Sequence, residues 1–209
     1  MANILIVGAN QGIGYYLVER LLELGNCVTE LDVQTDGILA LKEKYQKTVL
    51  PIIADARNLS DIENGVRQAV DFFGDIDAAI HNACLCTFES EYDTDYEVYQ
   101  KVMDVNYFGA LRLAKTVLPN MRKAKKGRII FTSSGVGVTG FSASGIFVPE
   151  EFKADAKKVG CGLAEQIWSK KFVICHSVSC AVQMKFSYRH PLYIGKMMTK
   201  AAKRSVRAL

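Results

Sequence analysis

Residues 4–14 read ILIVGANQGIG, an apolar run followed by three glycines at positions 8, 12 and 14. The run over residues 3–8 has the composition of a buried strand, and Leu17, Leu21 and Leu24 fall on one face of a helix expected over residues 12–24. At such a junction the glycines permit a tight turn, a close approach to a pyrophosphate and close packing of helix on strand. Helix N-termini also attract phosphate. The stretch predicts a nucleotide site, with an ordinary strand-to-helix turn as the alternative.

The alternation of short apolar runs with helical periodicity continues along the chain. Further strands are expected over residues 27–32, 49–54, 78–81, 128–133 and 172–176. Further helices are expected over residues 36–46, 60–73, 94–122 as one helix or two, and from about residue 155. Residues 135–147 are rich in glycine and read as a loop. This order predicts an α/β fold with three layers and a doubly wound parallel sheet.

Length and composition predict one domain over residues 1–209. The chain is 49% apolar and contains no uncharged apolar run of about 18 residues, so no membrane span is expected. The sequence opens directly on a strand without a secretory pattern, which favours a cytoplasmic location. The six cysteines and three histidines show no spacing typical of zinc ligands, so we expect no metal and buried, reduced thiols. We expect no nucleic-acid partner.

The charge is distributed unevenly. Residues 1–165 contain 17 basic and all 22 acidic side chains, a sum of −5, whereas residues 166–209 contain nine Lys or Arg and no acid. Residues 191–209 are expected to form a basic amphipathic helix that follows Pro191. Such a helix can lie on an anionic membrane surface, or it can cover the protein's own core or a subunit contact. Peripheral membrane contact and a homo-oligomer are therefore both kept as hypotheses.

Asp32 ends the second expected strand, 24 residues after Gly8. A carboxylate at about this distance from the first glycine can accept hydrogen bonds from both hydroxyls of an adenosine ribose, and it repels a 2′-phosphate. The next three residues, Val33, Gln34 and Thr35, offer no Lys or Arg to bind that phosphate. The sequence therefore favours NAD over NADP.

The glycine spacing G-x-x-x-G-x-G resembles that of the short-chain dehydrogenase/reductase family, and further matches follow in order along the chain. Asp55 resembles the family's adenine contact, and residues 81–84, HNAC, resemble its N-N-A-G motif. Asn106 resembles the Asn that holds a proton-relay water, and Ser134 resembles the Ser that orients a substrate carbonyl. Turn or helix-cap chemistry is the alternative for these last two residues. The resemblance implies a Rossmann fold that binds NAD(P).

The resemblance and the glycine turn together give the candidate site. The catalytic candidates are Asn106 and Ser134. The cofactor-binding candidates are Gly8, Asn10, Gln11, Gly12, Ile13, Gly14, Asp32, Val33, Asp55, Ala56, Asn82, Ala83 and Cys84. Cys84 is expected to pack as a small residue rather than to react, because no basic neighbour would stabilise a thiolate.

The family's catalytic Tyr, with a Lys four residues later, is missing from this sequence. The corresponding positions hold Phe147 and Glu151, and none of the nine tyrosines has Lys four residues after it. Similarity resumes at Val148, only 13 residues intervene between Ser134 and that position, and a helix plus a strand needs more. The sheet is therefore expected to be one strand and one helix short.

Two function hypotheses follow. The first is an NAD-dependent oxidoreductase that transfers a hydride between nicotinamide and a small alcohol or carbonyl substrate. The second is a catalytically inactive nucleotide-binding or interaction protein. The missing Tyr and Lys favour the second hypothesis for the chain as written, because a phenyl ring has no proton to transfer.

Overall fold

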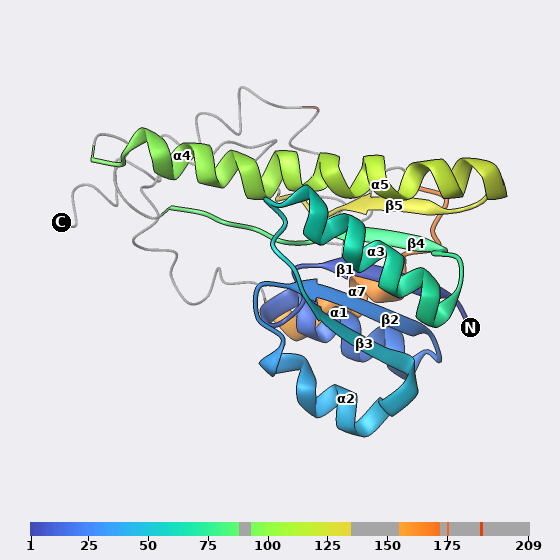
Figure 1. The fold of residues 1–209 in the computed structure, drawn as a ribbon. Coiled ribbons are helices and arrows are strands. Elements are labelled where there is room, and N and C mark those ends of the chain that lie inside the picture. Colours follow the sequence, from blue (N-terminus) through green and yellow to red (C-terminus); the bar gives the residue numbers. More distant parts are fainter. Residues whose placement is uncertain (88–92, 135–154, 172–174, 176–188, 190–209) are drawn as a thin grey trace.

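The computed structural model describes residues 1–87, 93–134, 155–171, Cys175 and Arg189. Within them a parallel five-stranded sheet has the order β3-β2-β1-β4-β5 (Figure 1). The strands are β1 Asn3–Val7, β2 Cys27–Asp32, β3 Val49–Ile53, β4 Ala78–His81 and β5 Arg128–Phe131. The helices are α1 Gly12–Glu23, α2 Leu39–Tyr45, α3 Leu59–Phe73, α4 Tyr96–Met103, α5 Gly109–Ala124 and α7 Ala156–Ala164.

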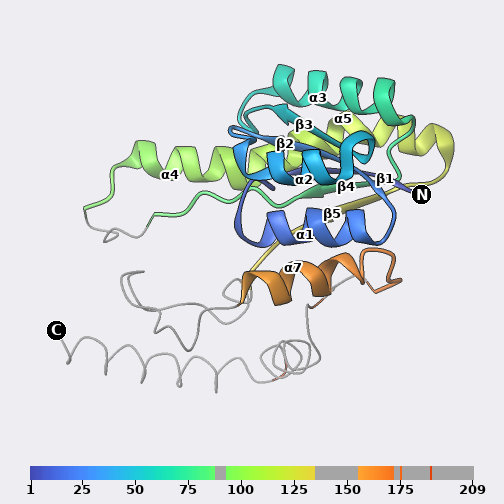
Figure 2. The same cartoon turned by 90° about the horizontal axis from the view of Figure 1, so that it is seen from below.

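Helices cover both faces of the sheet, as the sequence predicted. In Figure 2, α1 and α7 lie on one face of the sheet, and α3 and α5 lie on the other. One apolar core joins Ile4, Ile6 and Val28 of the strands to α1, α2 and α7. A second core joins Leu5, Val7 and Leu31 to α3 and α5. Alternate residues of one strand thus enter different cores, and the doubly wound, three-layer α/β fold is confirmed.

Several expected elements fall outside the described residues. These are the strand over residues 172–176, apart from Cys175, and the basic helix over residues 191–209. The loop over residues 135–147, with the positions of Phe147 and Glu151, also lies outside them. The expected loss of one strand and one helix therefore stays a prediction.

The stretch expected as one helix or two is a single helical run from Tyr96 to Ala124. It contains a π-helical turn, Asp104–Phe108, between α4 and α5. Figure 1 shows α4 and α5 as one continuous rod, in which α5 runs along the sheet and α4 extends beyond the ends of the strands. Such π turns are often found at functional sites, and this one contains the catalytic candidate Asn106. No helix in the described ranges is long and apolar enough to cross a bilayer.

Helix α7 packs directly on α1. A Cβ at Gly160 would lie 2.6 Å from the Ile13 carbonyl oxygen, so only glycine permits this approach of the two backbones. Arg20 of α1 donates to Glu165 at 2.8 Å, and Arg128 of β5 donates to the carbonyl oxygens of Ile167 and Ser169. The late helix is thereby fixed both to the helix of the glycine turn and to the last described strand.

Glu30 is a carboxyl group inside the sheet. Its side chain is fully buried on β2, and neither carboxyl oxygen has a hydrogen-bond partner among the described residues. Burial, followed by the nearby charge of Asp32, raises the pKa of Glu30 to about 8. Glu30 is therefore protonated in the native state at neutral pH.

This burial predicts that stability decreases with rising pH. The unfolded chain releases the Glu30 proton near pH 4.5, whereas the native state holds it to about pH 8. The contribution of Glu30 is fully present below pH 4.5 and is lost as the pH rises through this window. Glu30→Gln, which cannot ionise, should gain stability relative to the unmodified chain by on the order of 3 kcal/mol between pH 5 and 8. Urea unfolding at several pH values measures the difference, and parallel stability curves for the two proteins would contradict it.

Candidate functional site

The carboxyl ends of all five parallel strands meet at one edge of the sheet, and the candidate residues lie there. Gly8 follows β1, Asp32 ends β2, Asp55 follows β3, Asn82 follows β4 and Ser134 follows β5. The strand order reverses between β1 and β4. Ligands of open α/β sheets bind at such a switch point, beyond the carboxyl ends of the strands.

Gly8 is the residue around which this edge is packed. Its φ is +86°, and a Cβ at this position would lie 2.3 Å from the Cα of Ala83. Its N–H donates to the Leu31 carbonyl at 2.8 Å, and its own carbonyl accepts from the side chain of Asn82 at 2.6 Å. Gly8 therefore connects β1 to the ends of both β2 and β4.

The other two glycines differ in their surroundings. A Cβ at Gly14 would lie 2.4 Å from the Gly8 carbonyl oxygen, so Gly14 is needed for packing of the helix on the turn. Gly12 has a φ of +60° and nothing within 4 Å of a Cβ position. The second glycine thus faces open space, as the approach of a pyrophosphate requires.

The start of α1 is open to an anion. Gln11 and Gly12 are exposed, and Ile13 is half-buried. The Gln11 side chain makes no capping hydrogen bond, and the first turn holds no acidic residue. By contrast, Asn58 caps α3 and Asp155 caps α7 through their side chains. Backbone N–H groups and the helix dipole are therefore directed at the position where a phosphate would bind.

Asn10 connects the glycine turn to the end of β2. Its N–H donates to Asp32 at 3.1 Å, its side-chain amide donates to Asp36 at 3.3 Å, and its side-chain oxygen accepts from the Gly37 N–H at 2.7 Å. A Cβ at Gly37 would lie 2.0 Å from the Asn10 carbonyl oxygen. Asp36 and Gly37 were not singled out from the sequence, because a contact across 27 residues leaves no local pattern. Val33, beside Asp32, is 59% exposed.

The Asp55 carboxylate lies at the same edge but already has a partner. Arg57 donates to both of its oxygens at 2.6 to 3.0 Å, and these bonds are the main reason that the pKa of Asp55 is lowered. Ala56 beside it is buried. The Arg57 N–H also donates to Asp55 at 2.9 Å, so the carboxylate already accepts four contacts from Arg57, about as many as its lone-pair sites.

Asn106 holds the loop after β4. Its side-chain amide donates to the Leu85 carbonyl and accepts from the Leu85 N–H, each at 2.8 Å. His81 lies beneath the same π turn: it is buried, and burial lowers its pKa, while a hydrogen bond to the backbone of Val105 acts in the opposite direction. The sequence indicated Asn106, but it did not reveal the role of its partner Leu85. Ser134 is exposed beyond β5.

The expectation of buried thiols is wrong for Cys84 and its neighbour Cys86, which are both exposed. Both residues lie in the segment that follows the last residue of β4, His81. The Cys84 thiol is nevertheless less hydrated than that of a free cysteine. This partial desolvation raises the pKa of Cys84, in keeping with the expectation that it is not a thiolate. Among the described residues no group of three or more His, Cys, Asp or Glu could hold a metal ion.

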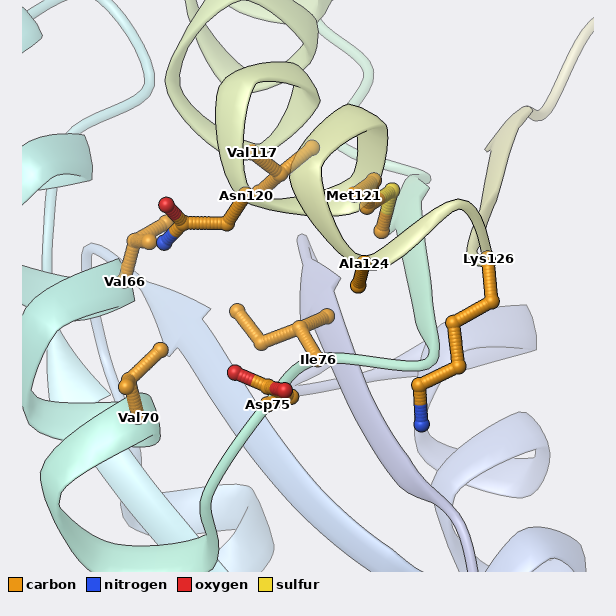
Figure 3. A pocket seen from close by; sticks show the side chains of 9 residues that line it. All are labelled: Val66, Val70, Asp75, Ile76, Val117, Asn120, Met121, Ala124 and Lys126. Atoms are coloured by element: carbon orange, nitrogen blue, oxygen red, sulfur yellow. The ribbon is translucent and has the colours of Figure 1, made fainter.

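A small cavity lies at the opposite edge of the sheet. Figure 3 shows its lining between α3 and α5, from Val66 and Val70 to Met121 and Lys126, with Ile76 just before β4. Its volume is about 10 Å³, which is room for about one water molecule. This cavity is too small for a nucleotide. It lies at the amino end of β4, whereas the glycine turn lies at the carboxyl ends of the strands.

Comparison with known proteins agrees with this geometry. The sequence model described as short chain dehydrogenase matches residues 2–147, which is more than half of the chain. The chain belongs to the short-chain dehydrogenase family. It is 31% identical over 153 residues to a 3-ketodihydrosphingosine reductase of Bacteroides thetaiotaomicron, which covers 73% of this chain and 54% of the relative. It is 31% identical over 139 residues to a cis-2,3-dihydrobiphenyl-2,3-diol dehydrogenase of Paraburkholderia xenovorans, which covers 64% and 50%.

Solved structures show the same fold. Levodione reductase superposes with a TM-score of 0.62 at 27% identity, over 66% of this chain and 56% of that one. A serine dehydrogenase from Escherichia coli has a TM-score of 0.62 at 24% identity, over 68% and 66%, and supports the fold alone. The chain spans about half the length of the curated relatives named above.

The different surroundings of two glycines give a matched pair of variants. Gly8→Ala forces a Cβ into the backbone of Ala83 at a positive φ, and should lower the free energy of unfolding by roughly 3 kcal/mol or prevent folding. Gly12 also has a positive φ, but a Cβ there would meet open space, so Gly12→Ala should lower the free energy of unfolding by only about 1 kcal/mol. Chemical denaturation measures both. Equal losses for the two variants would show that close packing at Gly8 does not matter.

Proposed function

We propose that this chain is a nucleotide-dependent oxidoreductase that binds NAD in preference to NADP and transfers a hydride between nicotinamide and a small alcohol or carbonyl substrate. The observation that carries the nucleotide part is the open, uncapped start of α1 beside Gly12, with Asp32 at the end of the neighbouring strand. The dinucleotide would extend from Asp32 across the glycine turn to the loop after β4, where Asn82, Ala83 and Cys84 lie.

Two features of the edge support NAD over NADP. Asp32 is held toward the turn by the Asn10 N–H, and Asp36 is connected to the same Asn10 through its side chain. Two carboxylates near the adenosine ribose would repel a 2′-phosphate, whereas ribose hydroxyls can donate to them. The Arg57 guanidinium is committed to Asp55 by three short hydrogen bonds, so it offers a 2′-phosphate little compensation.

The alcohol or carbonyl substrate is proposed from the family. The relatives named above are a keto reductase and a diol dehydrogenase, and the chemistry common to these names is the interconversion of a carbonyl and an alcohol. Asn106 and Ser134 are the catalytic candidates of this chain, Asn106 on the π turn and Ser134 beyond β5. Both residues lie at the carboxyl edge of the sheet, on the side of β1 away from Asp32.

A second candidate function rests on the sequence itself. No Tyr in the 209 residues is followed by Lys four positions later. Phe147 and Glu151 stand at the positions where the resemblance expects that Tyr and that Lys. A nucleotide-binding or interaction protein without hydride transfer would need neither group. Cofactor binding is common to both candidates, and turnover separates them.

Assembly and location stay predictions. Four large apolar side chains, each more than two-fifths exposed, recur at helical spacing along α4, the π turn and α5. They are Met103, Tyr107, Leu111 and Leu118, and this pattern favours a subunit contact. Peripheral membrane contact rests on the basic pattern of residues 191–209, which lie outside the described part of the chain. The cytoplasmic location rests on the sequence alone.

Nucleotide preference has a direct test. NADH should bind more tightly than NADPH in fluorescence titrations, and Asp32→Ala should narrow this preference by roughly tenfold, because a charged hydrogen-bond acceptor and a repulsive charge are lost together. Asp75→Ala is a matched control, because it removes the same charge from an exposed position just before β4. Tighter binding of NADPH by the unmodified chain would refute the preference.

Turnover decides between the two candidate functions. Because general acid catalysis supplies typically about 10² to 10⁴-fold, the chain without the Tyr and Lys pair should oxidise NADH with ketone substrates more slowly by at least that factor than an enzyme that has the pair. Slow turnover that the Ser134→Ala substitution abolishes would support the oxidoreductase. Tight NADH binding without turnover would support the second candidate, and turnover at an undiminished rate would contradict the expected deficit.

A further inference from the structure

Two exposed thiols flank the residue that Asn106 holds. Cys84 and Cys86 follow the Asn82-Ala83 pair at the end of β4, and both side chains are exposed and free. The thiols are hydrogen-bonded to each other, and this contact adds to the effect of burial in raising the pKa of Cys84. Both thiols therefore lie in one short exposed segment after β4, two residues apart.

The residue between them is fixed by the catalytic candidate. Both the N–H and the C=O of Leu85 are bonded to the Asn106 side chain at 2.8 Å. The chain just before the pair is fixed as well, because the Ala83 N–H donates to the Val7 carbonyl at 2.8 Å and Ala83 lies against Gly8. The segment that contains the two cysteines is therefore bonded to Asn106 and lies against the glycine turn.

We propose that Cys84 and Cys86 form a redox modification site, at which a low-molecular-weight disulfide such as glutathione disulfide oxidises the pair to an intramolecular disulfide. The geometry permits closure with a small contraction of the chain. Two residues span at most about 7 Å between Cα atoms, and disulfides bridge Cα atoms about 4.4 to 6.8 Å apart.

The reaction balances as two thiol–disulfide exchanges. Cys86 reacts first, because the raised pKa of Cys84 disfavours the Cys84 thiolate. The Cys86 thiol loses its proton to solvent, its thiolate attacks glutathione disulfide, and one glutathione thiolate leaves. The second cysteine then attacks the mixed disulfide, the Cys84–Cys86 bond forms, and the second glutathione leaves. The pair loses two electrons and two protons, and one glutathione disulfide becomes two molecules of glutathione.

Closure of this small ring distorts the backbone at Leu85. Its two hydrogen bonds to Asn106 need the N–H and the C=O to point toward one side chain, and contraction between the cysteines removes that arrangement. This consequence for the cofactor rests on the proposed function: the oxidised chain should bind NADH roughly tenfold more weakly, which corresponds to the loss of one or two hydrogen bonds.

The other described cysteines serve as internal controls. Cys27 is buried, Cys161 is half-buried on α7 and Cys175 is half-buried, and none of them has a second cysteine within two residues in the sequence. Trypsin would release residues 68–101 as one peptide that contains Cys84 and Cys86 and no other cysteine. The state of the pair can therefore be measured directly.

In the test, the full chain is equilibrated with mixtures of glutathione and glutathione disulfide, and free thiols are then blocked with an alkylating agent. After digestion with trypsin, the mass of the peptide 68–101 is measured by mass spectrometry. The expected product lacks two hydrogens and carries neither alkyl groups nor glutathione. Cys86→Ser should prevent this product, and Cys161→Ser should form it as the unmodified chain does. Doubly alkylated peptide at every ratio, or glutathione retained on the peptide, would overturn the proposal.

NADH titration of the reduced and oxidised chain completes the test and separates the inference from the proposed function. An unchanged NADH affinity after quantitative disulfide formation would overturn the connection to the cofactor site. Disulfide formation in a chain that binds no NADH in either state would support the redox site and contradict the proposed function. NADH binding without disulfide formation would support the proposed function and contradict the redox site.

Discussion

The nucleotide edge of this protein depends on one close backbone contact, that of Gly8 with Ala83. No side chain fits between the turn after β1 and the end of β4, since a Cβ would lie 2.3 Å from the Ala83 Cα. The contact brings the Asn82 amide to the Gly8 carbonyl and places Gly14 under the same turn. The start of α1, the end of β2 and the loop with Cys84 are consequently held at fixed positions around the switch point of the sheet.

Local patterns were sufficient to predict the helices and strands that the structure describes. β2 was predicted at its observed bounds, and α1, α3 and β4 were predicted within about one residue, because buried strands and amphipathic helices leave a periodic signal. The long helix was less certain from the sequence, because a π turn interrupts its periodicity at Asp104–Phe108. The glycines at positions 8, 12 and 14 likewise predicted the turn after β1, because such a turn needs residues without a side chain.

Contacts between distant segments were beyond the sequence. The bonds of Asn10 to Asp36 and Gly37 join a turn to a helix start, and the partner of Asn106 is a backbone 21 residues earlier in the chain. The sequence did not indicate that Arg57 pairs with Asp55, although the two residues are only two positions apart. Exposure of Cys84 and Cys86 was predicted incorrectly, since composition indicates how often thiols are buried and not where a chain leaves its sheet.

We propose that the glycine turn, the end of β2 and the loop after β4 form one binding surface for a dinucleotide. Hydrogen–deuterium exchange with and without NADH tests this claim most directly, since it measures each segment separately. Protection should be concentrated in residues 8–15, 31–37 and 82–86, and the segment around the small cavity at Ile76 and Met121 should not change. Protection that is absent from residues 8–15, or that is strongest around that cavity, would contradict the account.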